Sequence, residues 1–227
     1  MEKEIGRICA EGFSFFGMTN RLISHELKNI LAIISETLGL INELVELSET
    51  GMELKPGKLR SLSESVIEEV ERANRIIKNM NTFAHSVDEF VREVDIRQIV
   101  NLMIEMSQLD STGKNVRLRL VENEACVIYT SPFFLEKLIY NVINFSLLGA
   151  GPENEIRVSF DSDDHGVRII FSGIAPNIIG EFPTKKEDLL AEILSAKVSL
   201  DFTARELSII LPKKMGESFI QNLLPED

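Results

Sequence analysis

Two long stretches near the start of the chain repeat their apolar residues at helical spacing. Between Thr19 and Glu49, apolar side chains recur every three or four positions, and glutamate, asparagine and serine fill the other side. This pattern predicts an amphipathic helix. Turn signals at Thr50-Gly51 and Lys55-Pro56-Gly57 end it. The residues before Thr19 mix phenylalanine with glycine, and they fit either a helix start or a packed arm.

A second helix is predicted from Lys58 to Phe90, because a heptad seam with a single polar member, Glu69, runs through it. Two long helices joined by a short loop form an αα-hairpin. One hairpin leaves apolar surface uncovered, and pairing two hairpins into a four-helix bundle buries that surface. We therefore expect a homodimer. The seam positions are Leu59, Leu62, Val66, Glu69, Ala73, Ile76, Met80, Phe83, Val87 and Phe90.

From Glu93 onward, short helices alternate with short strands. The order α-β-β-α-β-β-α-β-β is typical of an α/β sandwich. The sequence therefore predicts an α+β fold class, with a helical hairpin domain over residues 1–92 and an α/β sandwich over residues 93–227. The expected helices cover 96–109, 133–148 and 185–196, and the expected strands cover 116–121, 125–129, 156–160, 167–171, 198–202 and 206–211.

Composition narrows the range of partners. Hydrophobic content of 44% and charged content of 26% are ordinary for a globular protein. A net charge of −12 argues against nucleic acid or an anionic membrane as the main partner. No apolar run approaches the roughly 20 residues that span a bilayer, and the N-terminus lacks a signal-peptide pattern. Cys9 and Cys126 lie far apart, without metal or redox spacing. We expect a cytoplasmic protein with no metal site.

The candidate chemistry lies in the run Ser24-His25-Glu26-Leu27-Lys28-Asn29 on the first helix. Positions four apart share a helix face, so His25 and Asn29 should point the same way, with Lys28 close by. Glu26 is roughly 100° round the helix and is near enough to touch the imidazole. A free imidazole has a pKa of about 6.5 and is largely neutral and nucleophilic at neutral pH. The run thus combines a nucleophile, an acidic orienter and an amide.

Each of these residues also has an ordinary interpretation. A lone histidine on a helix is usually structural or merely exposed, and Glu26 and Asn29 fit solvated helix positions. Lys28 fits a solvated position better than a catalytic one. The functional interpretation of His25 rests on the whole run, the hairpin and the downstream domain together.

This arrangement resembles the catalytic core of bacterial sensor histidine kinases. The run from Ser24 to Asn29 is similar to the box that carries the phosphorylated histidine on the first helix of their dimerisation domain. Val94-Asp95-Ile96 is similar to the entry into their ATP-binding domain. Ser131 to Ile143 resembles the lead-in to their asparagine-box helix, and Phe171-Ser172-Gly173-Ile174-Ala175 stands where their glycine box begins.

The departures from this resemblance concern the nucleotide site. Phe145 stands where the family carries a magnesium-binding asparagine, and Phe171 stands where an aspartate would bind adenine. Gly173 keeps the glycine box, but Ala175 replaces its second glycine, and the segment after Pro176 lacks a Gly-x-Gly lid. The resemblance therefore implies a degenerate pocket that binds no ATP, and we expect no bound cofactor.

A histidine hairpin joined to such a domain resembles the bacterial histidine phosphotransferases. The resemblance implies that His25 carries a phosphoryl group to or from receiver-domain aspartates of response regulators, with Glu26 and Asn29 assisting and Lys28 contacting the partner. Mg²⁺ is expected in the receiver, and the receiver of an upstream kinase is a further candidate partner. Three alternatives stay open: an Asn29-dependent phosphatase of the regulator, a true kinase with an atypical ATP site, and a non-catalytic dimeric scaffold.

Overall fold

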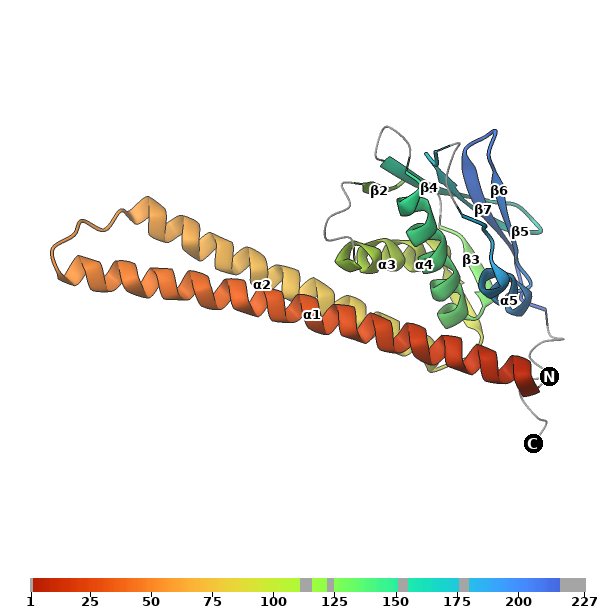
Figure 1. Ribbon diagram of the computed structural model, residues 1–227, viewed down its shortest axis with the longest axis horizontal. Helices are drawn as coiled ribbons and strands as arrows, with labels where there is room; N and C mark the ends of the chain where they lie inside the picture. The colour runs from red at the N-terminus through yellow and green to blue at the C-terminus, as the bar shows by residue number, and fades with distance from the viewer. Residues whose placement is uncertain (1, 111–115, 122–124, 151–154, 176–179, 217–227) are drawn as a thin grey trace. The chain divides into compact units, whose positions relative to one another are not determined.

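The computed structural model describes residues 2–110, 116–121, 125–150, 155–175 and 180–216. The chain forms two compact units, which we describe separately (Figure 1). One comprises residues 17–82, and the other combines the described residues up to Phe16 with those from Phe83 onward. The predicted boundary between residues 92 and 93 separates two functional domains and stays a prediction. It differs from the boundaries of the two compact units. The sequence also predicts a turn over residues 110–114, of which 111–114 lie outside the described residues, as do residues 176–179 of the segment that lacks a Gly-x-Gly lid.

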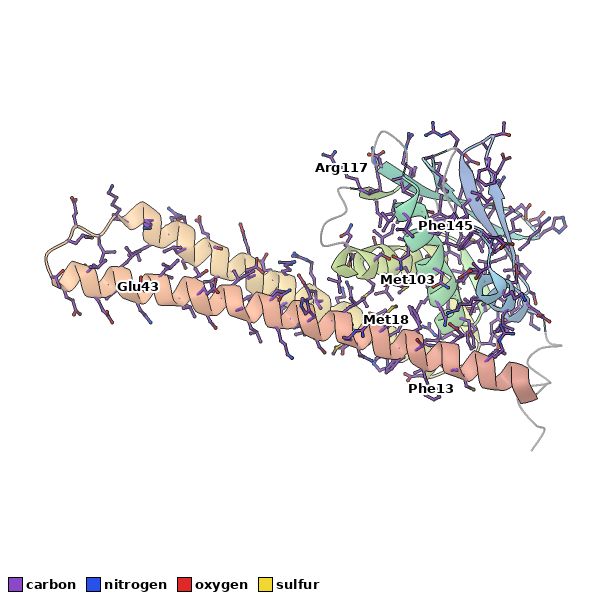
Figure 2. All side chains as sticks on the ribbon, in the orientation of Figure 1. Phe13, Met18, Glu43, Met103, Arg117 and Phe145 are labelled. Atoms are coloured by element: carbon purple, nitrogen blue, oxygen red, sulfur yellow. The ribbon has the colours of Figure 1, made fainter. Side chains whose placement is uncertain are left out.

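The helical unit is an antiparallel hairpin. It contains residues 17–49 of α1 (Glu2–Glu49) and most of α2 (Pro56–Ala84). Gly51 lies in the connecting turn with a φ of 96°, a conformation that glycine adopts readily. Figure 2 shows side chains projecting from both helices, with Glu43 on α1 among them. The most buried apolar side chains between the helices are those of Ile23, Ile30 and Ile76.

The first helix settles the alternative left open before Thr19, because α1 is continuous from Glu2. Gly12 is buried in the second unit, where a β-carbon would approach the ring of Phe133 at 3.3 Å. The second helix ends earlier than expected, at Ala84 instead of Phe90. A 3₁₀ turn, η1 (His85–Val87), follows it, and the hydroxyl of Ser86 donates to the carbonyl oxygen of Phe83 at 2.7 Å. Such bonds compete with regular helix geometry.

The second unit contains a five-stranded sheet in the order β2-β4-β5-β7-β6. Only β2 and β4 pair in parallel, and the other neighbours are antiparallel. The strands are β2 (Arg117–Leu120), β4 (Glu155–Ser162), β5 (Gly166–Ser172), β6 (Lys197–Asp201) and β7 (Glu206–Pro212). Alternate side chains are buried on one face, as strand geometry requires. They include Ile156, Val158, Phe160, Val167, Ile169, Phe171, Leu207, Ile209 and Leu211.

Three helices accompany this sheet: α3 (Ile96–Asp110), α4 (Pro132–Leu148) and α5 (Lys185–Ile193). Figure 1 shows α3 and α4 together on one side of the sheet. A small second sheet pairs β1 (Arg92–Asp95) with β3 (Val127–Thr130), and β1 was not predicted. Ser131 is a residue type that often caps helices, and it precedes α4, but its side chain makes no capping hydrogen bond. These elements give the expected α+β fold class.

Across the described ranges, no helix is both long and apolar enough to cross a membrane.

Candidate functional site

His25 lies exposed on α1 and contacts the amide of Asn29, one turn further along. Nδ2 of Asn29 lies 3.3 Å from Nδ1 of His25. This is the pair that helical spacing was expected to bring together. The imidazole is therefore accessible to a partner protein, and its Nδ1 faces the side-chain amide of Asn29.

Glu26 is buried, with 5% of its surface exposed. Its Oε1 forms a short ion pair with Nη2 of Arg72, which comes from α2. Its Oε2 accepts a hydrogen bond from Nδ2 of Asn29 at 3.4 Å. The sequence-based expectation placed this carboxylate against the imidazole. In the structure its contacts are instead with Arg72 and Asn29, so it reaches His25 through the amide.

Arg72 is the site residue that sequence reasoning missed. Besides Glu26, it contacts Glu69, with Nη1 lying 3.4 Å from Oε2. One signal was available in the sequence: Glu26 falls in the same helical stripe as Ile23 and Ile30, which are buried. A carboxylate in a buried stripe requires a cationic or hydrogen-bonding partner.

Lys28 is exposed on α1. Among the described residues its ammonium group has no ion-pair or hydrogen-bond partner, so it lies at the surface near His25 without a defined role. The structure thus joins His25, Asn29, Glu26 and Arg72 into one connected group and leaves Lys28 outside it.

In the second unit, Phe145 on α4 stacks on Phe182, with ring centroids 4.4 Å apart and an interplanar angle of 20°. Phe145 is labelled on α4 in Figure 2. Gly180 also lies beside this ring, since a β-carbon there would be 3.4 Å from it. The helix position that resembles a magnesium-binding asparagine is therefore occupied by an aromatic stack.

Of the other three predicted pocket residues, Phe171 lies within β5 near its end, and Gly173 and Ala175 follow the strand. Phe171 is fully buried in the sheet, where it pairs with Val158 and Leu207 in register. Gly173 has a φ of 102°, and a β-carbon there would lie 2.3 Å from the carbonyl oxygen of Glu155. Ala175 donates its backbone N–H to the carbonyl of Gly149 at 2.7 Å. These residues contribute to the packing of the central strand β5 and of the segment that follows it.

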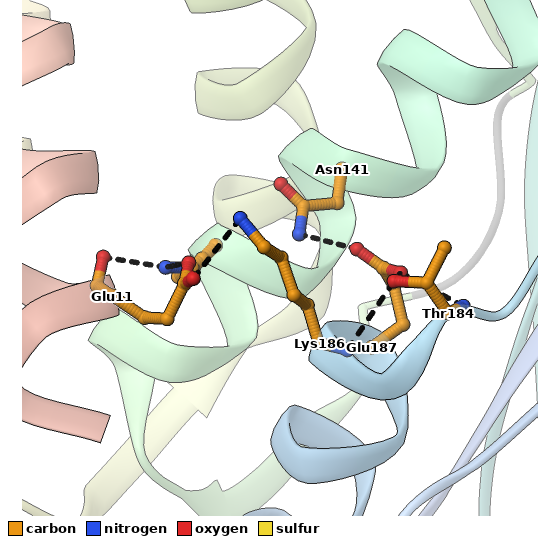
Figure 3. A network of polar contacts seen from close by, with 6 residues as sticks. Glu11, Asn141, Thr184, Lys186 and Glu187 are labelled. Carbon is orange, nitrogen blue, oxygen red and sulfur yellow. Dashed lines mark hydrogen bonds and ion pairs between the residues drawn. The ribbon is translucent and has the colours of Figure 1, made fainter. Parts of the chain in front are cut away.

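A polar network covers the adjacent part of α4 (Figure 3). Nδ2 of Asn141 donates to Oε1 of Glu187 at 2.8 Å, and Glu187 also forms the capping box of α5 with Thr184. The asparagine whose position resembles the family's asparagine box is therefore bound to a protein carboxylate. The same picture shows Glu11 reaching towards Lys186.

Glu11 links the first helical turns to α4 and α5. Its Oε2 lies 2.9 Å from the ammonium of Lys137, and its Oε1 lies 3.0 Å from that of Lys186. Burial alone would raise the pKa of Glu11, but its hydrogen bonds with the two lysines outweigh burial and lower it. Burial also lowers the pKa of Lys137, and Glu11 partly offsets that effect. Phe15 packs nearby against the rings of Phe83, Phe133 and Tyr140.

Within the ranges that the structure describes, no group of three or more histidine, cysteine, aspartate or glutamate side chains is arranged to hold a metal ion.

Comparisons with known proteins give structural matches only. No protein-family model matches the sequence. No curated protein matches it either. A solved structure described as a bacterial phosphotransferase is 14% identical, with a TM-score of 0.50, covering 86% of this chain and 94% of its own. The Acinetobacter baumannii histidine kinase AdeS is 14% identical over 83% of this chain and 98% of its own, with a TM-score of 0.42.

The ATP-binding domain of PrrB from Mycobacterium tuberculosis is 19% identical over 55% of this chain and 98% of its own, with a TM-score of 0.44. At these identities the comparisons concern the fold alone. The fold is α+β and is similar to that of the bacterial phosphotransferase structure.

Proposed function

We propose that this chain is a histidine phosphotransferase of a two-component phosphorelay. His25 carries a phosphoryl group to or from receiver-domain aspartates of response regulators, without ATP-dependent autophosphorylation. The observation that carries the proposal is the exposed imidazole of His25 with Asn29 fixed beside it. A protein partner can reach such a group, whereas a buried structural histidine is closed to one.

The reaction needs only a neutral ring nitrogen and a phosphorylated receiver. The nitrogen attacks phosphorus, an N–P bond forms, the P–O bond to the aspartate breaks, and the aspartate leaves as a carboxylate. In the reverse step, the phosphoryl group passes from His25 to the aspartate of another receiver. Mg²⁺ held by the receiver would neutralise charge on the phosphoryl oxygens. The chain itself is proposed to bind no cofactor.

The proposal that ATP does not bind is supported by the second unit. Phe145 stacks on Phe182, and Asn141 is bonded to Glu187, on the helix that would have to supply nucleotide contacts. An aromatic stack offers no ligand for Mg²⁺, which prefers oxygen. On this basis the chain is a pseudokinase in which the sheet domain has a structural or docking role.

We further propose a homodimer in the cytoplasm, where receiver domains act. Several large apolar side chains of the hairpin are exposed, and a second copy that completes a four-helix bundle would cover them. Sedimentation at micromolar concentration should give twice the chain mass, and a monomer would contradict this part of the proposal. The exposed side chains include Leu31, Leu38, Leu40, Ile67, Val70 and Ile77.

A second candidate function is hydrolysis of the receiver's phosphoaspartate, because Asn29 lies beside His25. An amide can orient a water molecule towards phosphorus without any covalent intermediate. Loss of activity in Asn29→Ala but not in His25→Ala would identify the chain as a dedicated phosphatase. Full biological function of His25→Ala would instead favour a non-catalytic scaffold.

The deciding experiment uses receiver domains from the source genome, each phosphorylated with labelled acetyl phosphate. Label should move to this chain, and His25→Ala should abolish the transfer. His85→Ala, which removes another exposed histidine, is the control and should retain it. If no receiver labels the wild-type chain, the proposal is wrong. Micromolar binding of a fluorescent ATP analogue with Mg²⁺ would favour a kinase with an atypical ATP site.

A further inference from the structure

The carboxylate of Glu26 determines which end of the Asn29 amide faces inwards. A carboxylate accepts hydrogen bonds and cannot donate them, so the NH₂ group of Asn29 must face Glu26. The same nitrogen lies 3.3 Å from Nδ1 of His25. Its two hydrogens therefore serve Glu26 and His25 together. It follows that Nδ1 accepts a hydrogen bond and that the hydrogen of the neutral ring lies on Nε2.

In this arrangement neither ring nitrogen offers an accessible lone pair, so attack on phosphorus requires the Asn29 amide to turn. The lone pair on Nδ1 faces the Asn29 amide, and Nε2 carries the ring hydrogen. If the amide turned, its Oδ1 would accept a hydrogen bond from Nδ1–H, and the lone pair would move to Nε2. That turn would bring Oδ1 against the carboxylate of Glu26, where two acceptors repel each other.

Arg72 holds the carboxylate in this position. Its guanidinium pairs with Glu26, and it is itself anchored by Glu69 on the same helix. Glu26 is 5% exposed, so water cannot readily replace the guanidinium as its partner. The ion pair thus acts on His25 through Asn29, and Arg72 is a positioning residue.

We propose that the Arg72–Glu26 ion pair controls how phosphoryl groups are divided between His25 and water. This inference rests on the proposed function. With the ion pair intact, the inward NH₂ group leaves Oδ1 of Asn29 to accept a hydrogen bond from water. That water attacks phosphorus, the P–O bond to the aspartate breaks, and the products are the free carboxylate and dihydrogen phosphate. When the amide turns, Nε2 attacks instead and the phosphoryl group stays on His25.

The test measures two products from one phosphorylated receiver: label on His25 and labelled inorganic phosphate. Glu26→Gln keeps the shape of the side chain but can meet either end of the Asn29 amide. It should raise the ratio of His25 label to inorganic phosphate about tenfold, the factor that corresponds to about 1.4 kcal/mol. Arg72→Gln should act in the same direction.

Two further variants separate positioning from folding. Arg72→Lys retains a cation for Glu26 and should keep the wild-type ratio. Arg60→Ala also removes an arginine of α2 that pairs with a glutamate, in this case Glu64 at 3.2 Å, and should leave the ratio unchanged. Far-UV circular dichroism must show that every variant is folded.

Nitrogen NMR of the His25 ring gives a readout that does not need a receiver. At a pH where the ring is neutral, the wild type and Arg60→Ala should show an unprotonated Nδ1 and a protonated Nε2. Glu26→Gln and Arg72→Gln should show averaged signals from both forms. Identical ring signals in all four proteins would overturn the inference, as would an unchanged product ratio in Glu26→Gln. If no receiver reacts, the proposed function fails, and the NMR result then tests only whether the ion pair determines the ring tautomer of His25 through Asn29.

Discussion

Glu136 offers a sharp test of how the second unit responds to pH. This carboxyl group lies on α4 with 2% of its surface exposed, and among the described residues its Oε2 has no hydrogen-bond partner. Burial raises its pKa from 4.5 to about 8, against the opposing effects of a hydrogen bond with Ser86 and the charge of Arg92. Between pH 4.5 and about 8, the folded unit therefore keeps this proton, whereas Glu136 in the unfolded chain has lost it.

The sign and size of the effect follow from proton linkage. Between pH 4.5 and about 8 the folded state binds more protons than the unfolded state, so the free energy of unfolding falls as the pH rises. Each pH unit across that interval is worth about 1.4 kcal/mol, and the whole interval is worth roughly 5 kcal/mol. Glu136→Gln resembles the protonated acid and has no proton to lose. Relative to wild type, the variant should gain stability progressively from pH 5 to pH 8.5.

Urea unfolding at several pH values measures this difference. The chain has no tryptophan and two tyrosines, Tyr129 and Tyr140, both in the second unit, so tyrosine fluorescence reports on that unit alone. Glu192→Gln, which removes an exposed acid from α5, is the control for a simple change of charge. If the Glu136→Gln and wild-type stabilities stay parallel from pH 5 to pH 8.5, the reasoning about the buried carboxyl group is refuted.

Three other substitutions test the packing. Gly173→Ala should destabilise the second unit by at least about 2 kcal/mol, because its β-carbon would lie 2.3 Å from the carbonyl oxygen of Glu155; an unchanged urea midpoint would contradict this. Glu11→Ala should cost about 3 kcal/mol by leaving the buried ammonium of Lys137 without its carboxylate, and a wild-type midpoint would show that the contact contributes nothing. Gly39→Ala should stabilise the hairpin by about 0.5–1 kcal/mol, since among the described residues the added methyl meets no atom within 4 Å; a lower Tm by circular dichroism would disprove it.

Periodicity predicted the elements whose burial is regular over many residues. The two long helices and the paired strands β4 and β5 follow from repeats of three to four or of two positions. Strand β1 was missed because it has four residues, of which Val94 alone is buried and apolar. Its pairing with β3 is a tertiary contact that no local pattern reveals.

The end of the second helix shows a local rule overriding a regular pattern. The heptad seam continues through Val87, yet that residue is 52% exposed. Ser86 is buried instead, and its hydroxyl binds the carbonyl of Phe83 as the chain tightens into a 3₁₀ turn. A heptad pattern of apolar residues can therefore extend in the sequence beyond the residue at which the helix ends.

The site illustrates a different limit. His25 and Asn29 were predictable because both lie on one helix, where spacing alone determines proximity. The sequence offered Glu26 as a candidate site residue, but it did not predict the partner of this carboxylate. A buried carboxylate must find a cation, and α2 offers Lys58, Arg60, Arg72, Arg75 and Lys78.

Which of these basic residues meets Glu26 depends on how the two helices align along their length, and this alignment depends on the turn geometry and on packing at every contact between them. The structure selects Arg72. That choice changes the proposed chemistry, because a carboxylate held by Arg72 acts on the imidazole only through Asn29. In the proposed mechanism, the direction of the Asn29 amide, and with it the balance between transfer and hydrolysis, is determined from the opposite helix.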